Sequence, residues 1–74
     1  MLAQRGEPFD LPTLARRHFG SDATVRKGDD GLTRVRLKTV PGMAKMAGFM
    51  TEIRRLGAGA NWDAQHQEFI INPL

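Results

Sequence analysis

Seventy-four residues with a formal net charge of +3 and no cysteine make a short, basic chain. A chain of this length builds one core and buries only about 60% of the surface that its unfolded form exposes. The lack of cysteine excludes disulfides, thiolate zinc sites and cysteine nucleophiles, and it favours a reducing, cytoplasmic setting. No apolar run approaches the roughly 18 residues of a membrane helix, so no membrane partner is expected.

The positive charge is concentrated in the middle of the chain. Between Arg16 and Arg55, ten Lys and Arg residues stand against four Asp and Glu residues. A surface of this sign attracts polyanions, either nucleic acid or an acidic protein face. A basic surface that is only solvated has the same composition, so charge alone assigns no function.

Residues 1–8 mix charge, glycine and proline, which predicts a flexible arm before a single domain of residues 9–74. Asp10 is expected to cap a helix that has Pro12 in its first turn and ends at Gly20. The apolar residues of this helix share one face: Leu11, Leu14, Ala15 and Phe19.

A β-hairpin is predicted next, from two runs over residues 23–27 and 32–40. Gly-Asp-Asp-Gly joins them and favours a tight turn. In the second run Val35 and Leu37 alternate with cations, as in a strand with one buried face. The other face would then carry Arg34, Arg36 and Lys38. Side chains two apart on a strand lie about 6.6 to 7 Å apart, close to the spacing of phosphates along a single strand.

A second helix is predicted after Pro41 and Gly42, where apolar residues recur at spacings of three and four. Its stripe consists of Met43, Met46, Phe49, Met50, Ile53 and Leu56. The segment 57–61 is expected to unwind this helix, and strands are expected at 62–64 and 68–71. Trp62 is predicted to lie in the core, because burying it removes about 150 to 250 Å² of surface from water.

These elements predict an α+β fold of the order αββαββ, with both helices on one face of a small, largely antiparallel sheet. The predicted C-terminal core consists of Met46, Phe49, Met50, Ile53, Leu56, Trp62, Phe69 and Ile71.

The C-terminal half resembles a known small domain. Val40 and Pro41 end a predicted strand, and Leu-Gly-Ala at 56–58 ends the helix. Trp62 and Asp63 come next, followed by an aromatic residue, a β-branched residue and a proline: Phe69, Ile71 and Pro73. This order resembles the Leu-Gly-Ala-x-Trp-Asp domain appended to plasmid and phage primases and to DNA-transfer proteins.

In outline the chain is also similar to the HARP module of annealing helicases. It departs from the primase-appended pattern by the inserted Gly59 and Ala60, by Phe69 at the second tryptophan, and by Asn72 before the proline. The resemblance implies a fold and a nucleic-acid setting, and no particular activity.

No catalytic constellation is predicted. His18 and His66 are the only histidines and are not spaced as a metal pair. Asp29 and Asp30 lie between glycines, where turn formation accounts for them. Ser21 has no His-Asp arrangement, and the glycines form neither a P-loop nor a dinucleotide fingerprint. We therefore expect no enzyme, no cofactor and no metal.

The sequence predicts a small basic accessory protein, of phage or plasmid type, that binds nucleic acid or a nucleoprotein complex. The predicted contacts are Arg34, Arg36, Lys38, Arg26, Lys27, Arg54 and Arg55. One alternative is an inhibitor or adaptor of the anti-CRISPR kind, whose cations cover an acidic surface of a host defence complex. A second is a structural homodimer, paired through a sheet edge or the Met-rich helix.

Overall fold

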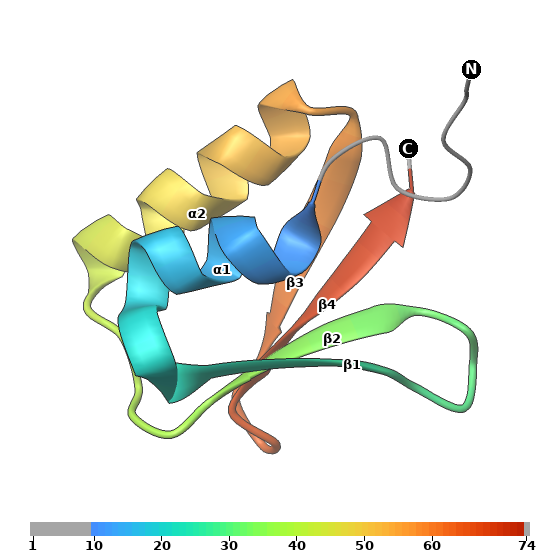
Figure 1. Ribbon diagram of the computed structural model, residues 1–74, viewed down its shortest axis with the longest axis horizontal. Coiled ribbons are helices and arrows are strands. Elements are labelled where there is room, and N and C mark those ends of the chain that lie inside the picture. Colours follow the sequence, from blue (N-terminus) through green and yellow to red (C-terminus); the bar gives the residue numbers. More distant parts are fainter. Residues whose placement is uncertain (1–9, 74) are drawn as a thin grey trace.

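Within residues 10–73, a four-stranded sheet carries two helices on one face and leaves the other face open (Figure 1). This computed structural model describes residues 10–73, so the arm predicted over residues 1–8 lies outside the described residues. The elements are α1 (Leu11–Phe19), a short 3-10 turn (Gly20–Asp22), β1 (Ala23–Lys27), β2 (Thr33–Leu37), α2 (Met43–Arg55), β3 (Ala58–Asp63) and β4 (Glu68–Pro73). The predicted α+β class and the order αββαββ are confirmed.

Helix α1 begins and ends at the residues that the sequence predicts. Asp10 Oδ1 accepts a hydrogen bond from the Thr13 backbone N–H at 3.3 Å, and Oδ2 accepts one from the Thr13 hydroxyl at 2.6 Å. These bonds, the hydroxyl's above all, lower the pKa of Asp10 below its usual value. Gly20 ends the helix at φ 64°, in the left-handed region that favours glycine.

The strands lie in the order β1-β2-β4-β3, and every neighbouring pair is antiparallel. The last strand of the sequence is therefore internal, and β1 and β3 are the two edges. Because side chains alternate along a strand, Thr33, Val35 and Leu37 of β2 are buried beneath the helices. The opposite side is here called the open sheet face.

The core is built around phenylalanine rings from three elements. Phe49 of α2 lies 5.1 Å from Phe19 of α1 and 4.9 Å from Phe69 of β4, measured between ring centroids. Trp62 packs edge-on against Phe69 at 4.8 Å but is only partly buried. Ile53 and Ile71 are buried, as predicted.

The ends of the predicted apolar stripe on α2 do not reach the core. Met43 is 85% exposed and Leu56 is 38% exposed, whereas Met46 and Met50 are partly buried. The prediction that Leu56 belongs to the core is therefore wrong. Met43 is the first residue of the helix and Leu56 follows its last, so the contact with the sheet is made by the turns between them.

Several strand boundaries also differ from the prediction, most of all the end of β2 and the start of β3. β2 ends at Leu37, three residues before the predicted end at residue 40. β3 starts at Ala58, so the segment 58–61 is strand and not a connection. Gly57 follows α2 with φ 95°, in the left-handed region that favours glycine, and so ends the helix. The residues after it have a weak strand propensity, so the sequence does not predict a strand there, but hydrogen bonding to β4 holds them in one. No helix within residues 10–73 is long and apolar enough to cross a membrane.

Candidate nucleic-acid interface

The open sheet face divides into a basic half and a mixed half. Strands β1 and β2 place Arg26 directly opposite Arg34, and Thr24 opposite Arg36. The β4 and β3 half carries Glu68 opposite Asp63, and Ile70 opposite Asn61. Alternation along each strand puts all of these side chains on the side away from the helices.

Three arginines converge on one buried carboxylate, and we call Arg26, Arg34 and Arg36 the arginine cluster. Glu68 Oε1 accepts a hydrogen bond from Arg26 Nη2 at 3.3 Å and lies 3.6 Å from Arg36 Nε. Glu68 Oε2 accepts one from Arg34 Nη1 at 3.2 Å. The Glu68 side chain is only 2% exposed, so its charge requires these partners.

The three arginines differ in how much of each remains available to a ligand. Arg34 also donates from Nη2 to Asp30 Oδ2 at 2.7 Å, and its side chain is 18% exposed. The side chains of Arg26 and Arg36 are 46% and 50% exposed. Arg34 is thus a structural member of the cluster, while Arg26 and Arg36 still present donors to solvent.

The β1–β2 turn holds Arg34 in place. Asp30 Oδ1 accepts the Leu32 backbone N–H at 3.0 Å, and this bond is the main cause that lowers the pKa of Asp30, with Arg34 adding to it. Gly28 leaves the space that Arg34 occupies, because a Cβ at position 28 would collide with Arg34 Nε. Asp29 and Asp30 therefore do lie in a turn, as the sequence predicts, and Asp30 also pairs with Arg34.

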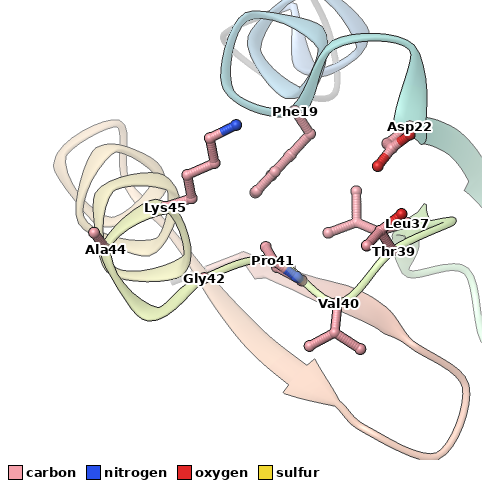
Figure 2. A pocket seen from close by; sticks show the side chains of 9 residues that line it. All are labelled: Phe19, Asp22, Leu37, Thr39, Val40, Pro41, Gly42, Ala44 and Lys45. Carbon is pink, nitrogen blue, oxygen red and sulfur yellow. The ribbon is translucent and has the colours of Figure 1, made fainter.

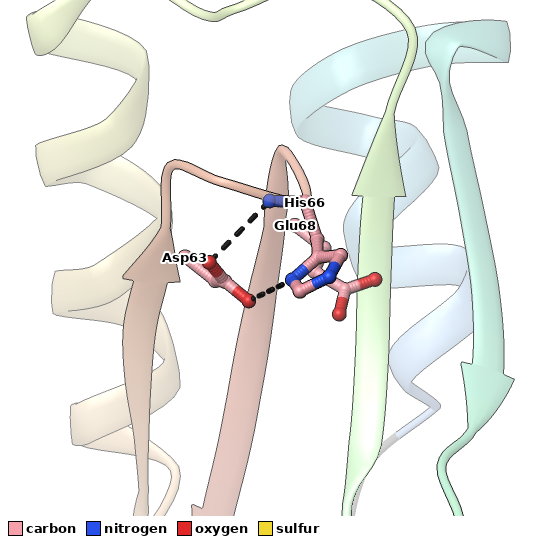
Figure 3. Close-up of side chains that lie close together, drawn as sticks. All are labelled: Asp63, His66 and Glu68. Carbon is pink, nitrogen blue, oxygen red and sulfur yellow. Dashed lines mark hydrogen bonds and ion pairs between the residues drawn. The ribbon is translucent and has the colours of Figure 1, made fainter.

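Asp63, His66 and Glu68 lie close together beside the β3–β4 turn (Figure 3). Asp63 Oδ2 lies 2.7 Å from His66 Nδ1, and Oδ1 accepts the backbone N–H of Gln65 at 3.1 Å. The His66 side-chain hydrogen bond is the first cause of the lowered pKa of Asp63.

These three side chains offer donor atoms within 4.8 Å of one another, a spacing that a divalent metal could use. Both oxygens of Glu68 already contact guanidinium groups, however. Three positive charges on one carboxylate oppose the entry of a cation, so we assign no metal to this cluster.

A hollow of about 330 Å³ opens beside the arginine cluster. Its carboxylates are Asp29, Asp30, Asp63 and Glu68, against two arginines, Arg26 and Arg34, and one histidine. Acidic groups outnumber the basic ones, so a phosphate would not settle inside this hollow. The half-exposed guanidinium groups of Arg26 and Arg36, with Lys38 just beyond the end of β2, make up the positive part of the open sheet face.

The other predicted contact residues do not share one surface. Lys38 follows β2 and is exposed, and Lys27 is exposed at the end of β1 but alternates onto the helix side of the sheet. Arg54 and Arg55 form the exposed last turn of α2, in the helix layer. The sequence predicts that Arg54 and Arg55 join the strand cations at one interface. Their positions in the helix layer do not support this.

Sequence reasoning missed Glu68, which organises the whole cluster. Glu68 stands between a polar turn and the apolar Phe69, and strand alternation would place it on the face opposite Phe69, so nothing in the local sequence indicates that its side chain is buried. The signal lies in the strand order, because β4 is inserted between β2 and β3 and brings Glu68 opposite Arg36.

A second hollow, of about 360 Å³, lies where α1 ends and α2 begins (Figure 2). Phe19 and Leu37 line it with apolar surface, and Lys45 and Asp22 extend from opposite sides. Val40 beside it is 60% exposed. The residues that line this hollow form no catalytic or ligand-specific arrangement.

Comparison with protein-family models, with curated proteins and with solved structures finds no match to this chain. The resemblance to the primase-appended domain and to the HARP module therefore remains a prediction.

Proposed function

We propose that this protein binds nucleic acid, or a nucleoprotein complex, through the basic half of its open sheet face. The observation that supports this proposal is the arginine cluster, with half-exposed Arg26 and Arg36 on the face opposite α1 and α2, which no helix of residues 10–73 covers. Arg36 on β2 and Lys38, which follows the end of β2, are both exposed and extend this positive surface. The cysteine-free composition is in keeping with a cytoplasmic setting.

Glu68 would prepare the cluster for binding. A guanidinium has five N–H donors, and in Arg26 and Arg36 the closest contacts to Glu68 use one nitrogen each. The remaining N–H groups of Arg26 and Arg36 can donate to phosphate oxygens. Because Glu68 already holds both side chains in place, they lose less conformational entropy when a phosphate binds. Lysine side chains without such a partner would lose more conformational entropy on binding the same phosphates.

The expected contacts are to the phosphate backbone. Within the described strands no Phe or Trp points to the open sheet face, so bases would find no aromatic platform. Three phosphate contacts, by Arg26, Arg36 and Lys38, would give a slope of log affinity against log salt of about −2 to −3.

The test is a salt-dependent titration with single- and double-stranded DNA and RNA. Changing Arg26, Arg36 and Lys38 together to Ala should abolish binding at about 50 mM salt, and each single change should reduce the salt slope by about 1. The matched control replaces Arg54 and Arg55 by Ala, since these exposed cations lie in the helix layer. Undetectable binding by the unmodified protein, or equal losses in both variants, would overturn the proposal.

The mixed charge of the same face favours a second candidate, the inhibitor or adaptor that covers an acidic protein surface. The arginines of β1 and β2 lie beside Glu68 and Asp63 of the neighbouring half, so the face is not a uniformly basic groove, and Arg is enriched at protein interfaces. A partner retained from host lysate after nuclease treatment, and lost when Arg36 becomes Ala, would favour this candidate. Loss of every partner on nuclease treatment would exclude it.

A further inference from the structure

The edge strand β3 has the features of a surface that pairs with another strand. The sheet order leaves β1 and β3 at the edges, and an edge strand presents backbone N–H and C=O groups unless charge or proline blocks it. β1 carries Arg26 and Lys27. β3 reads Ala-Gly-Ala-Asn-Trp-Asp, with one charge at its end. We infer that two copies of this chain associate by pairing their β3 strands, which joins two four-stranded sheets into one.

The hydrogen-bonding register shows which groups of β3 face outward. The Leu37 N–H donates to the Gln67 carbonyl at 3.0 Å, so Gln67 turns its backbone groups toward β2. Backbone groups alternate in direction along an antiparallel strand, so positions 68, 70 and 72 turn toward β3. Their partners on β3 are Asp63, Asn61 and Gly59. The remaining positions, Ala58, Ala60 and Trp62, therefore point their N–H and C=O groups out of the sheet.

This pattern is complementary to itself. In an antiparallel pair centred on Ala60, Ala60 faces Ala60 of the second copy, and Ala58 faces Trp62 of the second copy. All three positions point their backbone groups outward, so each can bond its counterpart, and the arrangement closes as a two-fold dimer. No like charges oppose one another among these positions. Trp62 is partly buried in one chain and would gain cover from Ala58 of the other.

The space beside β3 suits the incoming strand. A hollow of about 360 Å³ lies along this edge, with Met50, Thr51 and Arg54 of α2 on one wall and Asn61 on the other. α2 runs alongside β3 (Figure 1), so a strand added at the usual spacing of about 4.8 Å would lie against the flank of the helix. Association would also enlarge the core of a chain that is small for a stable domain.

The experiment is sedimentation equilibrium of the full chain without nucleic acid, from about 1 μM to 1 mM, with emission of the single tryptophan recorded in parallel. We expect a monomer–dimer equilibrium and a blue shift of Trp62 emission as the dimer forms. Ala60→Pro removes the outward N–H at the centre of the pair and leaves the β3–β4 bonds in place. It should raise the dissociation constant at least about tenfold.

A second variant keeps the test decisive if Ala60→Pro does not fold. Asn61→Lys places a charge on the exposed β3 edge, and Thr24→Lys places the same charge on β1 as the matched control. We expect Asn61→Lys to weaken the dimer at least about tenfold and Thr24→Lys to leave it unchanged. A monomer at every concentration, a dimer that survives both β3 variants, or equal loss in Thr24→Lys would overturn the inference. Nucleic-acid binding by the basic half is measured separately and does not depend on this outcome.

Discussion

Glu68 is the residue on which the open sheet face depends. Its carboxylate is 2% exposed and contacts three arginines, so its charge is compensated only by the folded chain. Removing one partner of a buried ionic group leaves the other partners without compensation, which costs more than the loss of an exposed pair. The half-exposed positions of Arg26 and Arg36 moderate that cost, because water can reach them.

Glu68→Gln is expected to destabilise the fold by about 1 to 3 kcal/mol. Glutamine keeps the size of the side chain but not the charge that the three guanidinium groups require. Urea unfolding followed by circular dichroism measures the change. Glu52→Gln is the comparison variant, since Glu52 contacts His18 and Arg17 at 30% exposure and its neutralisation should cost less than that of buried Glu68. A loss below about 0.5 kcal/mol, the range of ordinary surface substitutions, would contradict this role.

At the scale of elements, α2 was predicted correctly as a helix, but its sequence did not determine which residues of its apolar stripe contact the sheet. The stripe has the right period, yet only Phe49 and Ile53 within it are fully buried. These two residues are four apart and lie on one line of the helix, directly over the sheet. Met43, at the first position, points its side chain into solvent.

The positions along α2 should therefore differ sharply in their effect on stability. Phe49→Ala is expected to cost about 3 to 5 kcal/mol, because it empties the centre of the ring cluster. Met43→Ala should stay within about 0.5 kcal/mol. If Phe49→Ala does not fold, Ile53→Val should still cost about 0.5 to 1.5 kcal/mol. Thermal and urea unfolding measure these differences, and a Met43→Ala loss as large as that of Ile53→Val would contradict the burial pattern.

At the scale of the whole molecule, one polar link joins the two helices of the covering layer. Glu52 Oε1 of α2 lies 2.6 Å from His18 Nε2 of α1, and Glu52 Oε2 accepts a bond from Arg17 Nη1 at 3.4 Å. The hydrogen bond with His18 is the first cause that lowers the pKa of Glu52 below its usual value. A carboxyl group whose pKa is lower in the folded state stabilises that state most when it is ionised in both states.

This link predicts an acid-dependent stability. The contribution of Glu52 should be complete above its unfolded pKa of about 4.3 and should fade as the pH falls through its lower folded pKa. The melting temperature of the unmodified protein should exceed that of Glu52→Gln at pH 6, and the difference should shrink toward zero near pH 3. Melting curves across this range test it. A difference that is constant with pH would show that the Glu52 charge does not stabilise the fold.

Much of the fold could be predicted from local chemistry. Asp10, Pro12 and Gly20 fix α1 because capping and chain stiffness act within a few residues. The alternation of Val35 and Leu37 with arginines identified a strand with one buried face. The start of β3 could not be predicted in this way, because Ala58 and Gly59 have no strand preference and form a strand only against β4.

The candidate site was predictable only in part. The sequence by itself determined that Arg34 and Arg36 share one strand face, since the period of a strand requires it. Only the tertiary structure decided that β4 lies between β2 and β3, that Glu68 is buried beneath three arginines, and that Arg54 and Arg55 lie in the other layer. The physical reason is that these contacts are made by residues far apart in the chain. The order of the strands brings such residues together, and local sequence preferences do not determine that order.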